Sequence, residues 1–256
     1  MEVNPNLRVS VMTLISGIDS NINLKELYET IQINDTFKYL EYGDNPKKGE
    51  KYNKVSKPRG NKAVKYFYNQ ITLHVYSNKI INVKIFNNGK FQMTGVKNIQ
   101  QGKDVVDIVY NFICNLSTDR KEKILDNLNP IKKEIQVGMI NSDFNIGFKV
   151  NREALHRIII SRGHYSSFEP SIYPGVNIKY YYNPLDYSGL CKCDEVCDGK
   201  GKNGCCKKIT VAVFNSGSTI ITGAQSFDQL NKGYDFIMNV INEKKNEIIQ
   251  KDEINK

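Results

Sequence analysis

Five of the six cysteines lie between Cys191 and Cys206, in a stretch that is rich in glycine and lysine. Four thiolates from such a cluster form the tetrahedral ligand set of structural zinc sites. The candidate ligands are Cys191, Cys193, Cys197 and one of Cys205 and Cys206. The spacing is not that of a standard zinc ribbon, so a structural zinc ion, free thiols and disulfides all stay open.

Other residues that do chemistry are dispersed. The three histidines are His74, which we expect in a strand, and His156 and His164, which we expect at the surface. We find no phosphate-binding glycine loop, no nucleophile motif and no pair of carboxylates at functional spacing. The sequence therefore predicts a protein that is not an enzyme, with zinc as its candidate cofactor and none required for the fold.

Charge and composition favour a polyanionic partner. Lys and Arg number 36 against 27 Asp and Glu, which gives a net charge of +9. Apolar residues make up 40% and charged residues 25%, as in folded globular proteins. No apolar run reaches the roughly 18 residues that cross a bilayer, and the first residues do not form a secretory signal. We expect no membrane association and an intracellular location, not secretion.

An internal repeat organises the chain. Residues 85–95 read IFNNGKFQMTG and residues 213–223 read VFNSGSTIITG. Identical residues recur at a fixed offset of 128 positions: Phe86 and Phe214, Gly89 and Gly217, Thr94 and Thr222, Gly95 and Gly223. Four identities at one offset indicate two copies of one structural unit.

Each copy predicts two strands and a helix. Apolar residues alternate with polar ones before each turn, at Ile81, Val83 and Ile85 and again at Ile209, Val211 and Val213. The turns contain Asn and Gly, and each following strand is expected to end at its Thr-Gly pair. Asn98 and Ser226 have N-cap spacing to Gln101 and Gln229. The predicted apolar helix stripes are Val105, Val109, Phe112 and Leu116, and Phe227, Leu230, Tyr234, Ile237 and Ile241.

The chain is therefore divided into two halves. The first repeat is expected over residues 7–117 and the second over residues 134–250, joined by a charged connector at 118–133 with a short helix at 119–128. The first half carries a basic insertion at residues 46–65, either a solvated loop or an arm that adds affinity for DNA. The second half carries the cysteine-rich insertion at residues 186–208.

One helix can cover only one face of its sheet. The opposite face carries Phe86, Gln92 and Thr94 in the first half and Phe214, Ile220 and Thr222 in the second. A repeated Phe on an uncovered face needs a reason. A surface that binds a ligand, a subunit interface and a larger core are the alternatives.

The motifs resemble those of the TATA-box-binding protein family. The relevant segments are Phe86-Asn-Asn-Gly-Lys90 to Thr94-Gly-Val-Lys97, Phe214-Asn-Ser-Gly-Ser218 to Thr222-Gly-Ala-Gln225, and Tyr165-Ser-Ser-Phe-Glu-Pro-Ser-Ile-Tyr-Pro-Gly175. The resemblance implies an α+β saddle of two pseudo-symmetric repeats, with a curved antiparallel sheet and helices on the convex face. The cysteine-rich insertion resembles inserts in TATA-binding-protein-like proteins of giant DNA viruses.

The resemblance also implies minor-groove binding by the concave sheet, with aromatic rings wedged between base steps. The implied wedges are Phe86, Phe214, Tyr173 and Tyr68. The implied groove contacts are Val11, Thr13, Met139, Asn141, Gln92, Thr94, Ile220 and Thr222. The implied phosphate contacts are Lys90, Lys97, Lys179 and Ser216.

Two departures from the family bear on sequence preference. The family has an Asn on the first strand of each half, and this sequence has Val11 there in the first half and Met139, or Val137 in a shifted register, in the second. None of these side chains donates a hydrogen bond to the central base pairs. Lys84 and Gln92 replace apolar groove contacts. We therefore expect relaxed or altered preference, with A/T-rich sites still favoured by the deformability of T·A steps.

By resemblance, the chain is a transcription initiation factor that binds and bends promoter DNA. It would act with the RNA polymerase machinery in the nucleus or a viral factory, and a homodimer off DNA is a further expectation. A factor-IIB-like partner would contact Phe168, Glu169, Ser171 and Ile172. The alternative is a saddle-shaped protein-interaction module that has lost DNA binding.

Overall fold

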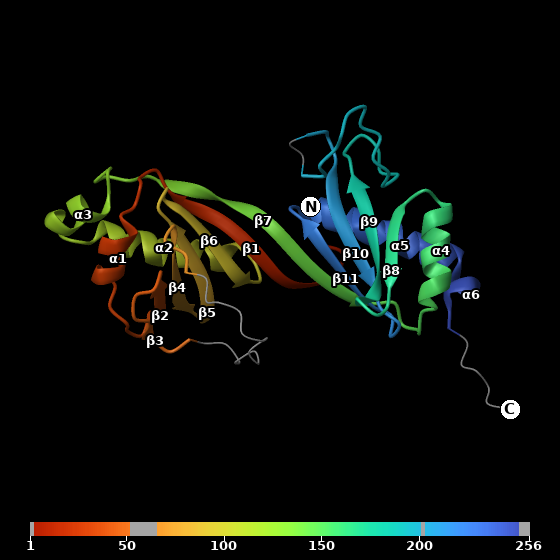
Figure 1. Cartoon of the computed structure of the whole chain (residues 1–256), viewed down its shortest axis with the longest axis horizontal. Coiled ribbons are helices and arrows are strands. Elements are labelled where there is room, and N and C mark those ends of the chain that lie inside the picture. The colour runs from red at the N-terminus through yellow and green to blue at the C-terminus, as the bar shows by residue number, and fades with distance from the viewer. Residues whose placement is uncertain (1–2, 52–65, 201–202, 251–256) are drawn as a thin grey trace. The chain divides into compact units, whose positions relative to one another are not determined.

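The computed structural model describes residues 3–51, 66–200 and 203–250. The chain separates into two compact units (Figure 1). We call Met12–Gly138 the first unit, and Met1–Val11 with Met139–Lys256 the second unit. Among the described helices, none combines the length and the apolar character that crossing a bilayer requires.

In its described residues, the first unit is an antiparallel sheet with three helices. Its strands are β2 (Phe37–Tyr42), β3 (Lys48–Gly49), β4 (Gln70–Ser77), β5 (Lys79–Phe86) and β6 (Lys90–Val96), with parts of β1 (Arg8–Ile18) and β7 (Lys132–Asn145). Their order is β3-β2-β4-β5-β6-β1-β7. The helices are α1 (Leu24–Thr30), α2 (Ile99–Cys114) and α3 (Thr118–Ile124).

The second unit repeats the plan. The remaining part of β7 is followed in the sheet by β11 (Ser218–Ala224), β10 (Lys207–Val213), β9 (Tyr173–Tyr182) and β8 (Tyr165–Glu169). Its helices are α4 (Arg152–Ser161), α5 (Phe227–Glu243) and α6 (Lys245–Ile248). β1 contributes Arg8–Val11 to this unit, so the compact units exchange short strand segments relative to the sequence repeats. The repeat bounds at 7–117 and 134–250 stay a prediction.

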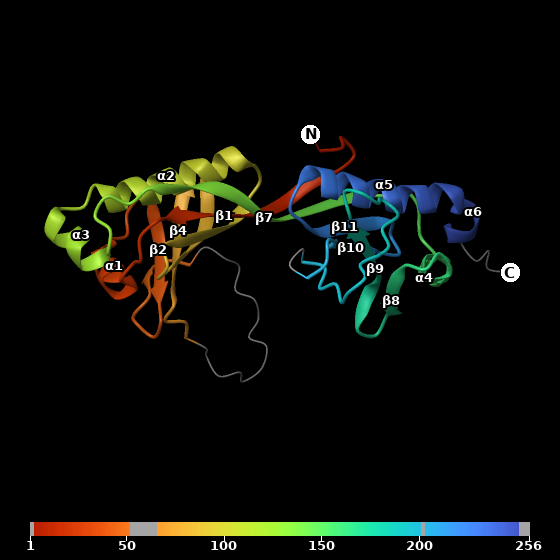
Figure 2. The same cartoon turned by 90° about the horizontal axis from the view of Figure 1, so that it is seen from above.

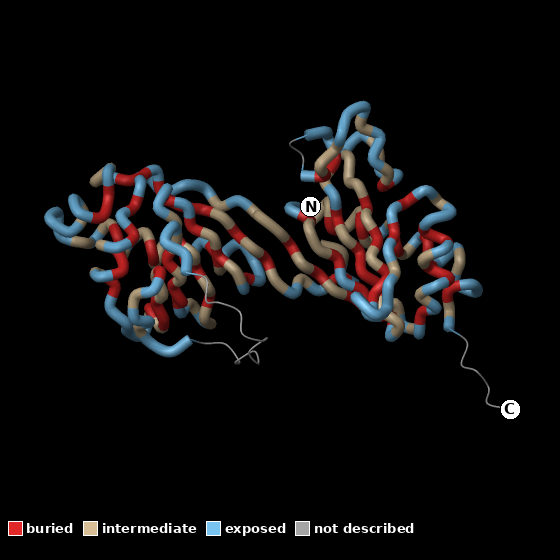
Figure 3. The backbone as a smooth tube through the Cα atoms, in the orientation of Figure 1, coloured by how far each residue is buried: buried red, intermediate tan, exposed pale blue. Residues whose placement is uncertain are grey.

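The alternation of apolar residues creates one buried sheet face in each unit. Ile81, Val83 and Ile85 on β5 are at most 1% exposed, and α2 packs against this sheet (Figures 2 and 3). Ile209, Val211 and Val213 on β10 are fully buried on the side of α5. The predicted core strands are therefore confirmed in both copies.

Both long helices begin with the predicted side-chain caps. The Asn98 side chain accepts a hydrogen bond from Gln101 N at 2.8 Å, and Gln101 Oε1 accepts from Lys97 N at 3.1 Å. In α5, Ser226 Oγ accepts from Gln229 N, and Gln229 Oε1 accepts from Gln225 N. These exchanges satisfy backbone donors at each helix start.

The predicted helix stripes are partly correct. Val105 and Val109 are buried on α2, but Val106 and Ile113 complete the stripe, whereas Phe112 and Leu116 are only half-buried. On α5, Leu230, Ile237 and Ile241 are buried, while Phe227 and Tyr234 are half-buried. The connector helix is α3, which ends at Ile124, before the predicted residue 128.

The Thr-Gly pairs do not end their strands, contrary to the expectation. β6 continues to Val96 and β11 to Ala224. Gly95 and Gly223 have φ of 88° and 95°, and the pairing register shifts beside them. A strand with an extra residue in a left-handed conformation is a β-bulge, for which glycine is the natural residue.

We predict that an added side chain destabilises the protein more at Gly217, in the hairpin of the second repeat, than at Gly147, in a neighbouring loop. Gly217 and Gly147 both have positive φ, of 82° and 92°. A Cβ at Gly217 would lie 2.5 Å from Phe148 O, whereas a Cβ at Gly147 meets nothing within 4 Å. Gly147→Ala should cost about 1–2 kcal/mol of unfolding free energy from backbone strain, and Gly217→Ala clearly more. Urea unfolding measures both, and equal losses would contradict the contact with Phe148.

Candidate nucleic-acid interface and metal centre

The sheet face away from α2 and α5, called the open face here, carries polar rows in each unit. In the first unit, the strand register aligns Thr72, Lys84, Gln92 and Ile15 in one row and His74, Asn82, Thr94 and Thr13 in the next. In the second, it aligns Tyr165, Lys179, Thr210, Thr222 and Asn141 in one row and Ser167, Asn177, Ala212, Ile220 and Asp143 in the next. The predicted groove residues on these strands therefore share one face within each unit.

The two first-strand positions that lack Asn are also half-buried. Val11 lies in the second unit with Met139, whose sulfur accepts a hydrogen bond from Thr222 Oγ1 at 3.8 Å. Neither side chain carries an N–H donor. The loss of direct readout at these two positions stays a prediction.

Two aromatic rings meet at the end of the open face in the second unit. The ring centroids of Tyr173 and Phe214 are 5.7 Å apart, with an angle of 60° between the ring planes. A Cβ on Gly175 would lie 3.0 Å from Tyr173 and 3.2 Å from Phe214, so this glycine leaves room for both rings. The predicted wedge residues of this half are thus brought together.

The corresponding pair in the first unit is arranged differently. Phe86 pairs with Gln70 in the sheet, and Tyr68 precedes Gln70 by two residues, as Tyr173 precedes Gly175. The Tyr68 ring instead packs against Gly43 and lies 6.3 Å from the ring of Tyr42. The described residues give Tyr68 no ring contact with Phe86, and Gln70 lies opposite Phe86 at the position that corresponds to Gly175.

The predicted phosphate-contacting residues lie at accessible positions. Lys90, Lys97 and Ser216 are exposed. Lys179 is half-buried, and its Nζ donates to Thr210 Oγ1 at 2.9 Å. Burial, with a smaller contribution from Lys208, lowers the pKa of Lys179. No carboxylate pairs with Lys179 among the described residues, which leaves its charge available to an anion.

One ion pair on the second unit was not predicted from the sequence. The Arg8 guanidinium binds both carboxylate oxygens of Asp143, at 2.8 to 3.2 Å. Asp143 lies in an open-face row beside Ile220. Arg8 neutralises an acid that would otherwise repel a polyanion from this face.

The buried histidines do not form a reactive set. His74 lies in β4 as expected, but His164 is 8% exposed and packs on Phe236, so its predicted surface position is wrong. Burial lowers the pKa of both histidines. Neutral imidazoles inside the fold act as packing residues here.

The predicted partner-binding segment forms the turn between β8 and β9. Phe168 lies between the ring of His156 and the guanidinium of Arg152. Ser171 Oγ donates to Glu169 Oε1 at 2.7 Å, and Ile172 is 83% exposed. The turn therefore presents an apolar tip beside a carboxylate that is already engaged.

Part of the basic insertion is tied to the fold. Lys47 and Lys51 both pair with Glu41, at 3.1 and 3.3 Å. Lys48 Nζ donates to the carbonyl oxygens of Tyr28 and Ile31 at the end of α1. The other basic residues of the insertion lie at positions 52–65, outside the described residues.

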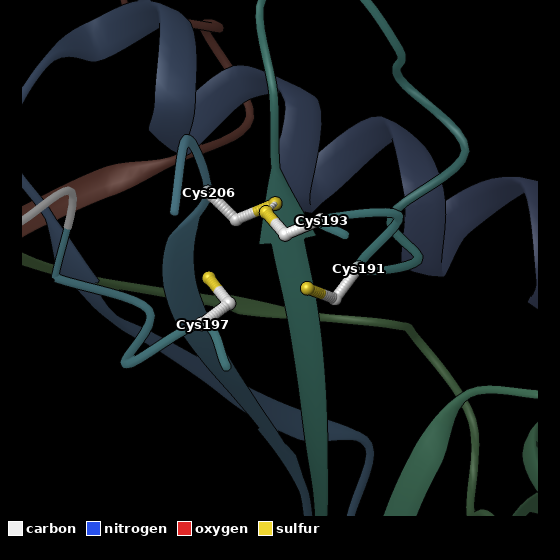
Figure 4. Close-up of side chains that lie close together, drawn as sticks. All are labelled: Cys191, Cys193, Cys197 and Cys206. Atoms are coloured by element: carbon white, nitrogen blue, oxygen red, sulfur yellow. Dashed lines mark hydrogen bonds between the residues drawn. The ribbon is translucent and has the colours of Figure 1, made fainter. Parts of the chain in front are cut away.

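Four cysteine sulfurs converge in the second insertion. The Sγ atoms of Cys191, Cys193, Cys197 and Cys206 all lie within 4.8 Å of one another, and those of Cys193 and Cys206 are 3.6 Å apart (Figure 4). Tetrahedral zinc with bonds of about 2.3 Å needs sulfurs roughly 3.8 Å apart. The cysteines are free thiols in the structure, so this cluster has the chemistry and the spacing to hold a metal ion.

The backbone brings these thiols together at the end of a hairpin. Lys208 N donates to Gly199 O at 2.8 Å, which folds the insertion back onto β10 beside the buried Cys206. A Cβ at Gly204 would lie 2.8 Å from Cys197 Sγ and 3.0 Å from Cys193 Sγ. Cys205 Sγ also lies 3.5 Å from Cys193 Sγ, but only Cys206 has its sulfur within 4.8 Å of all three other thiols in the group, so the geometry favours Cys206 of the two candidates.

Three comparisons place this architecture among known proteins. Residues 134–244 match the family model described as Transcription factor TFIID (or TATA-binding protein, TBP). The TATA-box-binding protein-like protein of Acanthamoeba polyphaga mimivirus is 26% identical over 248 residues, which are 92% of this chain and 65% of that protein. The solved Methanococcus jannaschii TBP covers 93% of this chain and 99% of its own, with a TM-score of 0.57 and 18% identity.

The fold is therefore the α+β fold of TBP, with an antiparallel sheet and helices on one face. The match of residues 134–244 to the TBP family model and the similarity to the mimivirus protein agree with the resemblance seen in the motifs. The chain spans about two thirds of the length of its mimivirus relative, at 65%.

We predict that two phenylalanines in the same hairpin differ in their effect on stability. Phe91 is fully buried on the helix side, whereas Phe86 is half-buried on the open face. Phe91→Ala should lower the unfolding free energy by about 3–5 kcal/mol, and Phe86→Ala by at most about 1.5 kcal/mol. Denaturant titration of both variants tests which face each ring occupies; a loss at Phe86 as large as that at Phe91 would place Phe86 in a closed core.

Proposed function

We propose that this chain is a TBP-like transcription initiation factor that binds promoter DNA through the minor groove. The observation that carries the proposal is the open face, which in both units combines a half-buried Phe ring with rows of polar side chains on the side of the sheet away from α2 and α5. The net charge of +9 supports a polyanionic partner. In this assignment the chain acts by binding and carries no catalytic site.

DNA bending follows from the wedges. Phe86 and the Tyr173–Phe214 pair are suited to partial insertion between base steps, which kinks a duplex. A tyrosine hydroxyl must find a partner when it is desolvated, so Tyr173 and Tyr68 are weaker wedges than phenylalanine. Phosphate contacts from Lys90, Lys97, Lys179 and Ser216 would fix the register, with the basic insertion adding affinity that is independent of sequence.

Sequence preference is expected to be altered. The centre of the site loses direct readout at Val11 and Met139, and Lys84 with Gln92 makes the first unit's face more polar. The cost of deforming the duplex still favours A/T-rich promoters with flexible T·A steps.

The partners proposed for this factor are those of transcription initiation. The exposed Ile172, with Phe168, Glu169 and Ser171, supports docking of a factor-IIB-like protein, which would recruit the RNA polymerase machinery. Off DNA, the open faces of two copies would cover each other in a homodimer. The mimivirus relative supports action in an infected cell, in the nucleus or a viral factory.

A protein-interaction module without DNA binding is the second candidate. It is favoured by the first unit, where Lys84 and Gln92 face each other and Tyr68 packs away from Phe86. Fluorescence anisotropy on A/T-rich and G/C-rich duplexes over a range of salt separates the two. Salt-dependent binding supports the transcription factor, and its absence on both duplexes supports the module.

We predict that removing the two phenylalanine wedges reduces bending more than it changes the salt dependence of binding. Phe86→Ala with Phe214→Ala leaves the phosphate contacts in place, so the slope of log K against log salt should stay the same. The bend angle in a circular-permutation assay should fall. Ile99→Ala with Ile160→Ala, which changes exposed apolar residues on α2 and α4, is the matched control. An unchanged bend in the wedge variant would count against insertion.

We also infer that the four-thiol cluster holds a structural zinc ion. Four converging sulfurs match the closed tetrahedral sites of zinc, a metal without redox chemistry of its own. When bound, zinc would fix the β9–β10 insertion by joining Cys191, Cys193 and Cys197 to Cys206 at the start of β10. The buried sheets do not include this loop, so the fold itself would not need the metal.

We predict one zinc ion per chain, with a sharp difference between neighbouring cysteines. Cys206→Ser removes a buried member of the cluster and should lower the zinc content or affinity strongly. Cys205→Ser is the matched control, and it should retain the metal because Cys205 lies outside the cluster. Metal analysis after anaerobic purification reads out both. Zinc near zero in the wild-type chain would remove the proposal, and equal loss in both variants would overturn the ligand assignment.

A further inference from the structure

Three asparagines on the open face share an unusual environment. The Oδ1 atoms of Asn82, Asn141 and Asn177 are buried and have no hydrogen-bond partner. Asn82 lies on β5 in the first unit, and Asn141 and Asn177 lie on β7 and β9 in the second unit. A buried carbonyl oxygen without a partner costs stability, so packing alone would favour an apolar side chain at these positions.

Their cross-strand neighbours belong to the candidate groove-binding surface. Asn82 faces Thr94 on β6, and Asn141 faces Thr222 on β11. Asn177 lies opposite Ala212 on β10 and Ser167 on β8. The other cross-strand neighbour of Asn82 is the buried His74 on β4, and Asn82 lines a hollow beside Lys84 and Thr72.

The orientation of the three amides determines what they offer. Because each Oδ1 is turned into the protein, the Nδ2 group is the part left towards solvent. In the described part of the chain, no protein acceptor binds any of these three Nδ2 groups. Each asparagine therefore presents a free N–H donor from the open face.

In the minor groove, A·T and G·C pairs differ in one group that such a donor would meet. A·T pairs present the acceptors adenine N3 and thymine O2, whereas G·C pairs add the N2 amine of guanine, itself a donor. An amide N–H that meets the floor of the groove is therefore satisfied at A·T and opposed by the guanine amine.

We propose that Asn82, Asn141 and Asn177 donate hydrogen bonds to the floor of the minor groove and exclude the guanine amine at their positions. The proposal rests on the proposed DNA binding and deepens it. Asn141 is two residues beyond Met139 on β7, and Asn82 is two strands away from β1. Direct readout is thus moved away from Val11 and Met139 to new positions and is not lost.

Inosine provides the direct test, because an I·C pair lacks the N2 amine but keeps the major-groove pattern of G·C. Duplexes of equal length that carry A·T, I·C or G·C pairs across the site are titrated with the full chain by anisotropy. The wild-type chain should bind the I·C duplex close to the A·T duplex, and both more tightly than G·C. Equal binding to I·C and G·C, or tighter binding to G·C, overturns the donor assignment.

Alanine variants assign the effect to residues. Asn82→Ala, Asn141→Ala and Asn177→Ala should each reduce the ratio of I·C to G·C affinity by roughly threefold, and the triple variant should remove most of it. Asn111→Ala, at an exposed position on α2, is the control and should keep the wild-type ratio. Variants that keep the ratio overturn the proposal even where wild-type DNA discriminates.

Thermal unfolding and the binding of any duplex at all distinguish a failure of this inference from a failure of the proposed function. Thermal unfolding of the alanine variants should show equal or higher stability than the wild type, because each loses an unpartnered buried oxygen. A marked loss of stability would mean that the amide has a structural role and would overturn the proposal. No binding to any of the three duplexes would instead overturn the proposed function itself, whereas binding without discrimination overturns only this inference.

Discussion

The structure depends on one constraint: an amphipathic helix covers a single face of the sheet on which it packs. In each unit, period-two alternation places apolar side chains under that helix and leaves their neighbours on the other side. Ile85 and Phe86 are adjacent in sequence, yet the first is fully buried and the second belongs to the open face. The candidate binding surface is thus the direct consequence of how the core is built.

The cysteine-rich insertion does not disturb the two faces of the sheet, because it lies in the connection between β9 and β10. It leaves the sheet after β9 and returns at β10, and the pairing of Lys207 with Tyr182 continues the register of the two strands without interruption. Only Cys206 among the clustered thiols is fully buried, at the start of β10. A hairpin end can therefore acquire a cysteine-rich loop without a change in the pairing of the two strands that it joins.

Local patterns were sufficient to predict the core strands, the Asn and Ser caps and the hairpin glycines, because each depends on residues within one or two turns of backbone. The bulges at Gly95 and Gly223 were missed, since a bulge depends on the register of a neighbouring strand. The burial of His164 depends on Phe236, far away in sequence. The choice of Cys206 over Cys205, and the unpartnered amides of Asn82 and Asn177, likewise required tertiary geometry.

The internal symmetry is kept on one face and lost on the other. Under the helices, Val83 and Ile85 correspond to Val211 and Val213, a nearly unchanged set. On the open face, Lys84 corresponds to Ala212, and Gln92 to Ile220. Packing against a helix restricts shape and polarity, whereas a face that meets a partner is free to diverge. In the proposed binding to promoter DNA, two unlike open faces would suit a site whose two ends differ and which is read in one direction.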